Sequence, residues 1–358
     1  RAMAGAVVAT MTVLTVRILR SKGRLGAMPT EQDIEDVRKI VLQSAKAASN
    51  LAMLGDKRFL FNSDRTAFVM YGEEGQSYIS MGDPVGPREA AVGLAWDFRE
   101  LCDVAGRTPV FYEVDEEYVS LYVEMGLPLI KIGEEARVRL QGFGLEGSAR
   151  KNLRRTNRQL SSAGCTFEIV EPPAISELVP TLKAISDAWL EDKHTEEKGF
   201  SLGFFRADDI DKSPVAIIRH KSRIVAFANL RFGANKEELS ADLMRYIPGS
   251  PEGVIEFLFI RLMLWGSENG YQWFSLGVAP LAGIEPQPRG PIWNQLASLT
   301  FRHGEHFYNF QGLRQYKDKF DPEWKGKFIA SPGGLSLPIT LANIATLISG
   351  GIGALIRK

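Results

Sequence analysis

The sequence predicts a mixed α/β fold in two halves, each a mixed sheet flanked by helices. Short runs rich in Val, Ile, Phe and Leu alternate with longer segments of helical periodicity. The glycine-rich stretch at 142–147 separates the two halves. A chain of 358 residues has room for two domains of roughly 150 to 200 residues.

The first half, residues 29–141, begins with a helix at 31–49, where Val37, Ile40 and Val41 recur at helical spacing. Apolar runs ending in the turn Gly82-Asp83-Pro84 then predict strands. The elements expected after the first helix are strands at 59–62, 66–71 and 77–81, a helix at 88–105, a strand at 108–113, a helix at 116–125 and strands at 128–132 and 136–140.

The second half, residues 142–332, contains three runs joined by short connections, which predicts an antiparallel meander. Ser250 and Pro251 are expected to begin the next helix as N-cap and first-turn residues. The expected elements are helices at 148–163, 176–191, 252–268, 292–302 and 311–319, strands at 166–170, 214–220, 223–232, 237–246 and 271–276, a loop at 278–291 and one last strand.

The two ends are unusually apolar. Residues 4–16 carry no charge, and basic residues follow, so we expect residues 1–28 to be the end of a transmembrane helix and a basic juxtamembrane segment. A cut signal sequence or a buried first helix is the alternative. Residues 333–358 predict an amphipathic helix at the membrane interface, and docking on the protein's own surface explains the same pattern.

Composition excludes several classes of protein. The 43 Lys plus Arg balance the 43 Asp plus Glu, which argues against a generally basic nucleic-acid binder. Cys102 and Cys165 are too few and too far apart for a disulfide framework. His303 and His306 lack a metal-binding frame, and no phosphate loop, dinucleotide fingerprint or nucleophile elbow occurs. We therefore expect no metal and no cofactor, and chemistry based on positioning and electrostatics.

One run is strongly basic. The segment RKNLRRTNR has five cations in nine positions and no acid. On a helix these charges form one broad stripe, whose repulsion a polyanion would relieve. Phosphates of RNA or of lipid headgroups qualify, and a solvated helix face is the alternative. The expected phosphate-binding residues are Arg150, Lys151, Arg154, Arg155 and Arg158.

Three further regions carry candidate site residues. Asp242 and Arg245 lie three apart on the third meander strand, so they share a face only if the strand ends or bulges there. Glu256 lies among apolar residues and must be paired or neutral, either in a structural ion pair or as an active-site carboxylate. Residues 307–328 combine aromatic and cationic side chains, which suits a ligand that is part apolar and part phosphate.

Four segments identify a family resemblance. SADLMRY, EGVIEFLF, HGEHFYNFQGLRQYKDKFDPEW and RKNLRRTNR resemble the catalytic domain of phosphatidylglycerol lysyltransferases, the bacterial multiple peptide resistance factor family, including its alanyl-transferring members. The likeness covers roughly residues 30–332. It implies two tandem GNAT-like acyltransferase folds and a preceding multi-span membrane domain at the inner membrane, with the catalytic domain on the cytoplasmic face.

The resemblance also implies a reaction and its residues. An aminoacyl group passes from aminoacyl-tRNA to phosphatidylglycerol, which lowers the negative charge of the membrane and confers resistance to cationic peptides. Asp242, Arg245 and Lys317 match positions used at the active site, and Glu256 and Arg314 lie inside matching blocks. A tRNA-dependent peptidoglycan aminoacyltransferase and a catalytically silent lipid-binding module are the alternatives, and an acetyl-CoA-dependent acetyltransferase is a weaker third.

Overall fold

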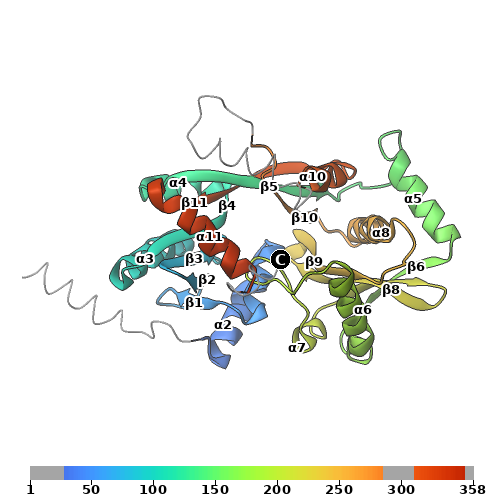
Figure 1. The fold of residues 1–358 in the computed structure, drawn as a ribbon, viewed down its shortest axis with the longest axis horizontal. Coiled ribbons are helices and arrows are strands. Elements are labelled where there is room, and N and C mark those ends of the chain that lie inside the picture. The colour runs from blue at the N-terminus through green and yellow to red at the C-terminus, as the bar shows by residue number, and fades with distance from the viewer. Residues whose placement is uncertain (1–27, 285–309, 351–358) are drawn as a thin grey trace, which may run out of the picture.

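A computed structural model describes residues 28–284 and 310–350, and one mixed sheet runs through both halves of them (Figure 1). The eleven strands follow the order β1-β2-β3-β4-β11-β5-β10-β9-β8-β7-β6. Helices flank this sheet, with α3 and α4 at one end of the view and α5 and α8 at the other. The predicted mixed α/β class is confirmed, and the division into two tandem GNAT-like folds at 141/142 stays a prediction.

The strands of the first half agree closely with the predicted ones, apart from the last. They are β1 (Arg58–Phe61), β2 (Phe68–Glu74), β3 (Ser77–Met81), β4 (Thr108–Asp115) and β5 (Leu129–Arg139). In the second half the predicted antiparallel meander is confirmed as β7, β8 and β9. The strands of the second half are β6 (Cys165–Val170), β7 (Val215–His220), β8 (Arg223–Phe232), β9 (Glu238–Tyr246), β10 (Trp273–Pro280) and β11 (Glu323–Ala330).

Helices connect and cover these strands. The α-helices are α2 (Glu31–Val41), α3 (Arg88–Ala105), α4 (Val119–Glu124), α5 (Lys151–Ser162), α6 (Val179–Asp192), α7 (Ala207–Ile210), α8 (Val254–Glu268), α10 (Phe310–Asp318) and α11 (Leu337–Ile348). The 3₁₀ helices are η1 (Ala47–Leu54), η2 (Glu116–Tyr118), η3 (Ala174–Glu177), η4 (Ala234–Lys236) and η6 (Gly334–Ser336). The predicted helix at 292–302 lies outside the described residues.

The two halves of the chain share their central strands. β11 lies between β4 and β5, and β5 pairs on its other side with β10. The two strands predicted at 128–132 and 136–140 are therefore wrong, because β5 is one continuous strand. Gly133 interrupts the apolar pattern that predicts a strand, but it lies inside β5. The backbone of β10 approaches it so closely that an added Cβ would lie 2.4 Å from the carbonyl oxygen of Ala279.

Two predicted helix ends also differ. The helix expected at 31–49 stops at Val41, where the Ser44 hydroxyl accepts a hydrogen bond from the Lys46 N–H and favours a turn. The helix expected from 252 begins after Gly253, whose φ is 83°. Ser250 is not its N-cap, because its hydroxyl donates to the Ile247 carbonyl at 2.6 Å.

Each half packs its sheet between two apolar clusters. In the first half Val69 packs toward α3, while Phe68 and Met70 pack toward α2 and η1. In the second half Ala228 packs toward α8 and Phe227 toward α6. This alternation is what a strand covered on both faces requires, and it decides on which face of the sheet each polar side chain lies.

The C-terminal helix α11 docks on the sheet of the first half. Ile344 is 5% exposed in the apolar cluster, and Leu347 packs against Gly72 of β2. Asn343 donates from Nδ2 to the Ser77 hydroxyl at 3.1 Å. Docking on the protein's own surface is thus present, while membrane contact through the outer face, where Ile339 is 62% exposed, stays a prediction.

Membrane insertion was expected only at the start of the chain. The apolar segment 4–16 lies outside the described residues. Within residues 28–284 and 310–350, none of the helices has the length and apolar character needed to span a bilayer.

Candidate functional site

A β-bulge brings Asp242 and Arg245 to the same face of the sheet. Ala228 of β8 pairs with Met244, whereas Leu230 pairs with Ala241, so β9 carries one extra residue between these pairs. The Asn229 side chain fills the bulge and accepts the Leu243 N–H at 2.6 Å. Without the bulge the two site residues would point to opposite faces. Both instead lie on the α6 side.

The parallel strands β9 and β10 separate at this point. They pair only from Trp273 to Ser275, opposite residues 238–240. Beyond Ser275 the register of β10 shifts, and the strand continues along β5 alone. Asp242 and Arg245 therefore follow the last β9–β10 pair on one strand, and Gly277 and Val278 follow it on the other. The two strands thus part next to these four half-buried residues.

Asp242 is a carboxylate with one buried oxygen that lacks a hydrogen-bond partner among the described residues. Its Oδ1 accepts the Gly203 N–H at 2.8 Å, and the Arg231 Nε lies 3.6 Å from Oδ2. Oδ2 is buried and has no hydrogen-bond partner among the described residues. Gly203 has to be glycine, because an added Cβ would lie 2.2 Å from Oδ2. An N–H or O–H of a substrate would satisfy this oxygen.

Arg245 is held beside Asp242 by an acid and an aromatic ring. Its Nη2 lies 3.0 Å from Glu197 Oε2, and its guanidinium carbon lies 4.2 Å from the centre of the Trp189 ring. Glu197 also accepts the Phe205 N–H at 3.3 Å. Arg245 Nη1 also donates to the Met244 carbonyl at 3.0 Å. These contacts fix the direction of the guanidinium, and its binding of a phosphate group stays a prediction.

Lys317 reaches the site from α10 on the β10 side. Its Nζ donates to the carbonyl oxygens of Gly277 at 3.0 Å and Val278 at 2.9 Å. Burial lowers the pKa of the ammonium to about 8, against the partly opposing charges of Glu135 and Glu113. A lysine with this pKa is partly neutral near neutral pH and can donate or accept a proton.

A buried charge network adjoins Lys317, and sequence reasoning missed it. Lys327 of β11 pairs with Asp115 of β4 and lies 3.1 Å from Glu135 of β5. The Ser275 hydroxyl donates to Glu135 at 2.6 Å. Burial raises the pKa of Glu113 to about 7. No local signal could reveal this network, because its members come from four strands that only the shared sheet brings together.

Glu256 does not join Asp242 and Arg245. Its side chain accepts a hydrogen bond from the Thr156 hydroxyl of α5 at 2.6 Å on Oε1 and one from the ammonium of Lys319, just after α10, at 2.6 Å on Oε2. Helix α8, which carries it, packs on the face of the sheet that also carries Ala228. Of the two alternatives left by the sequence, the contacts of Glu256 match the structural ion pair.

The basic helix α5 divides its charges into two groups. Arg150 donates to the Phe320 carbonyl at 2.7 Å, and Arg154 donates to the carbonyls of Leu145 and Gly147. These two arginines therefore bind neighbouring backbone carbonyls, so they do not form an exposed row of charges with Arg158. The side chains of a second group are exposed and make no hydrogen bond or ion pair within the described part of the chain. It consists of Lys151, Arg155 and Arg158.

Arg314 lies on α10 one turn before Lys317. It pairs with Glu134, and its guanidinium carbon lies 4.4 Å from the centre of the Trp324 ring. Lys131 shares the same carboxylate at 2.7 Å. Arg314 is thus mostly occupied by the protein itself, and a role in phosphate binding stays a prediction.

The site offers a carboxylate, a guanidinium and an ammonium around the separated ends of β9 and β10. Among residues 28–284 and 310–350 no group of three or more His, Cys, Asp or Glu side chains is arranged to hold a metal ion. His303 and His306 lie outside the described residues. Such a set can align two substrates and stabilise charge that develops during the reaction.

Comparisons with known proteins match most of the chain. The family model described as "Phosphatidylglycerol lysyltransferase, C-terminal" matches residues 38–331. The phosphatidylglycerol lysyltransferase of Bacillus subtilis is 37% identical over 307 residues, which are 86% of this chain and 36% of that protein. The enzyme of the same name from Staphylococcus xylosus is 34% identical over 301 residues, 84% of this chain and 36% of that protein.

Solved structures give the same result. The DUF2156 C-terminal domain from Agrobacterium fabrum superposes with a TM-score of 0.82 at 38% identity, covering 90% of this chain and 98% of that one. L-PGS from Bacillus licheniformis has a TM-score of 0.81 at 35% identity, covering 91% and 98%. The chain spans little more than a third of the length of the curated relatives. It belongs to the family of phosphatidylglycerol lysyltransferase C-terminal domains.

Proposed function

We propose that this chain transfers an aminoacyl group from aminoacyl-tRNA to a glycerol hydroxyl of phosphatidylglycerol. The group is lysyl, with alanyl as the alternative. Family membership supports the lipid acceptor, and one structural observation supports the site. The β9 bulge aligns Asp242 and Arg245 at the point where β9 leaves β10, and Lys317 of α10 binds backbone carbonyls of β10 beyond that point.

The reaction needs alignment more than activation. An aminoacyl-tRNA is an ester, and the glycerol hydroxyl attacks its carbonyl carbon to give a tetrahedral oxyanion. The ester bond to the ribose then breaks, and the ribose oxygen takes up a proton in place of the one that the attacking glycerol hydroxyl has lost. The new ester remains on the lipid. Aligning the two reactants and stabilising the oxyanion supply most of the catalysis such a step requires.

Each site residue has a role that its contacts allow. Asp242 binds the α-ammonium group or the attacking hydroxyl through Oδ2, which has no hydrogen-bond partner among the described residues. Arg245 binds the lipid phosphate. Lys317 uses two of its three N–H donors on Gly277 and Val278. Its third donor serves the oxyanion or the departing ribose oxygen.

The surroundings of the site suit its two large substrates. The exposed cations Lys151, Arg155 and Arg158 of α5 bind phosphates of the tRNA backbone. The outer face of α11 and the segment at 1–28 bring the chain to the membrane surface, on the cytoplasmic face and beside the membrane domain expected upstream. Aminoacylation makes the lipid less anionic, which lowers the affinity of the membrane for cationic peptides.

A reconstituted assay tests this function. The chain of residues 1–358 is incubated with vesicles containing phosphatidylglycerol and with lysyl-tRNA or alanyl-tRNA carrying a labelled aminoacyl group, and the lipids are separated by thin-layer chromatography. We expect labelled aminoacyl-phosphatidylglycerol from the wild type and not from Asp242→Asn. Transfer to a muropeptide amine instead would support a peptidoglycan aminoacyltransferase, and lipid binding without transfer would support the silent module.

A further inference from the structure

One segment of the second half joins the site to the first half of the chain. Residues 197–206, called here the crossing segment, connect the end of α6 to α7. On one side the Gly203 N–H and the Glu197 carboxylate hold Asp242 and Arg245, as described above. The positions of both site residues therefore depend on where this segment lies.

On its other side the crossing segment is bound at two places to the first half and at a third to α11, the helix that docks on that half. The Phe200 N–H donates to Asp56 Oδ2 at 2.8 Å. The Gly199 N–H donates to the Ile348 carbonyl of α11 at 2.9 Å, and Arg206 donates to the Leu54 carbonyl. Phe200 is 2% exposed and has a φ of 60°, a conformation that a non-glycine residue keeps only when its surroundings enforce it.

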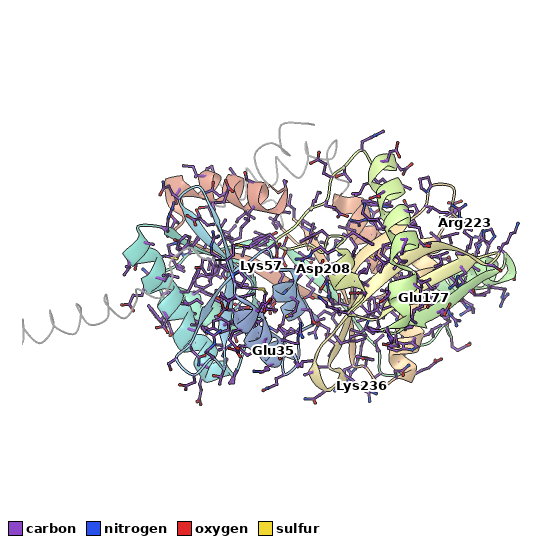
Figure 2. The ribbon with its side chains drawn as sticks, turned by 90° about the horizontal axis from the view of Figure 1, so that it is seen from below. Glu35, Lys57, Glu177, Asp208, Arg223 and Lys236 are labelled. Atoms are coloured by element: carbon purple, nitrogen blue, oxygen red, sulfur yellow. The ribbon has the colours of Figure 1, made fainter. Side chains whose placement is uncertain are left out.

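Lys57 is the charge that keeps Asp56 in place. Its side chain is fully buried, and its Nζ donates to Asp56 Oδ1 at 2.6 Å and to the Leu51 carbonyl at 3.0 Å. The same ammonium lies 5.8 Å from the centre of the Phe200 ring. Figure 2 shows Lys57 near the middle of the molecule, whereas Arg223 and Lys236 lie toward its rim. An ammonium so deeply buried needs a function or a partner to justify its desolvation.

The charges around Lys57 extend to the site. Burial lowers the pKa of Lys57. The negative charges of Asp56 and Asp242 oppose this shift, and the positive charge of Arg231 adds to it. Lys57 thus interacts electrostatically with Asp242 as well as with Asp56. Arg231 in turn lies 2.8 Å from Asp209 Oδ2. Arg231 also lies 3.6 Å from Asp242, so a cation of the second half contacts Asp242 directly, and Lys57 of the first half acts on it by charge at longer range.

We propose that Lys57 and Asp56 are positioning residues for Asp242 and Arg245, and that they act through the crossing segment. The inference rests on the proposed function for its effect on catalysis. Asp56 holds the strained Phe200 backbone, Lys57 fixes Asp56, and the segment then presents Gly203 and Glu197 to the two site residues. The first half of the chain thereby sets the geometry of a site whose reacting groups belong to the second half.

Three variants test the proposal. Asp56→Ala removes the acceptor of the Phe200 N–H, Asp56→Asn keeps an acceptor oxygen, and Lys57→Met keeps side-chain length without the charge. Arg107→Gln is the matched control, because it removes a first-half ion pair with Glu73 of 2.6 Å that does not touch the crossing segment. All are made in the chain of residues 1–358.

The first measurement is hydrogen–deuterium exchange of residues 197–206 without substrate. We expect faster exchange in Asp56→Ala and Lys57→Met, near wild-type exchange in Asp56→Asn, and no change in Arg107→Gln. Unchanged exchange in both Asp56→Ala and Lys57→Met would overturn the proposal, and so would equally fast exchange in the control. Because this measurement needs no turnover, it remains informative even if the wild type fails to aminoacylate the lipid and the proposed function is rejected.

The second measurement is steady-state transfer to phosphatidylglycerol vesicles. Misplacing a site group by about 1 Å costs roughly 10- to 100-fold in rate, so we expect kcat to fall by that factor in Asp56→Ala and Lys57→Met. KM for both substrates should change much less, and Asp56→Asn should recover most of kcat. A wild-type kcat in a variant whose segment exchanges faster would contradict the positioning role.

Discussion

Asp242 and Glu256 are both acids of the second half with little solvent exposure, yet their surroundings differ. Glu256 is satisfied by the protein, because a hydroxyl and an ammonium occupy its two oxygens. Asp242 keeps Oδ2 without a hydrogen bond among the described residues and lies where β9 and β10 separate. The difference teaches that burial alone does not separate the two acids. The presence of a buried oxygen without a hydrogen bond is what makes Asp242 the better candidate for a substrate contact.

Replacing Asp242 should give the largest effect on turnover. Asp242→Asn keeps the shape of the side chain and removes its charge, so we expect a loss of about 10²- to 10³-fold in kcat. The loss is measured as labelled aminoacyl-phosphatidylglycerol formed per minute. Asp187→Asn, an exposed acid of α6, is the control and should retain wild-type turnover. Turnover of Asp242→Asn within tenfold of the wild type would remove this residue from the site.

The pH dependence of turnover should report Lys317. If its protonated form stabilises the oxyanion, kcat stays level below pH 8 and falls as the pH rises through about 8, by up to tenfold per pH unit. Lys317→Arg should move this alkaline limb out of the accessible range, because the guanidinium stays charged. A wild-type profile that is flat from pH 7 to 10 would contradict this role.

Lys317 also affects stability, with a defined sign. Its folded pKa of about 8 lies below the value of 10.5 for the unfolded chain. Between these values the unfolded chain binds more protons, so the free energy of unfolding rises with pH. Because the buried charge costs stability at pH 7, Lys317→Met should be no less stable than the wild type in urea unfolding at that pH. The same variant should be inactive, since it lacks the ammonium. A loss above roughly 2 kcal/mol would show that the two carbonyl hydrogen bonds outweigh the desolvation of the charge.

Removing Glu256 should change stability more than catalysis. Glu256→Ala leaves the Thr156 hydroxyl and the Lys319 ammonium without their acceptor, which costs about 1 to 3 kcal/mol in the free energy of unfolding. kcat measured on folded protein should stay within about threefold of the wild type, far from the loss expected for an oxyanion-stabilising group. Lys319→Gln should lower the free energy of unfolding by less, because water can solvate the Glu256 oxygen that loses its partner. A loss of kcat as large as that of Asp242→Asn would restore Glu256 to the site.

The smallest effect is expected on α5, where two groups of cations can be compared. Arg155→Gln with Arg158→Gln should flatten the slope of log affinity for tRNA against log salt by about 0.7 to 0.9 per lost phosphate contact. Arg154→Gln should leave the slope unchanged, since Arg154 donates to backbone carbonyls. If the two changes give the same slope, or only the dependence on lipid concentration moves, the exposed group does not hold the tRNA.

Local patterns determined most of the secondary structure. Helical periodicity gave α3 with its observed ends, and short connections between β-rich runs gave the meander β7–β9. These features depend on neighbours within a few residues, so they are visible in one sequence. The family motifs likewise identified Asp242, Arg245 and Lys317 without any knowledge of how they meet, since residue type and spacing are written in the chain itself.

Tertiary structure decided the rest, because it depends on contacts between distant segments. The extra residue in β9 appears only when its pairing with β8 is known, and it alone places Asp242 and Arg245 on one face. The two strands predicted at 128–132 and 136–140 form the single strand β5, which pairs with β11, and Lys57 is buried beside the crossing segment. Both features depend on segments more than 100 residues apart in the sequence. The sequence by itself determined which charged groups are present, whereas the packing of the two halves decided which of them the protein satisfies and which, like Asp242 Oδ2, lack a hydrogen-bond partner among the described residues.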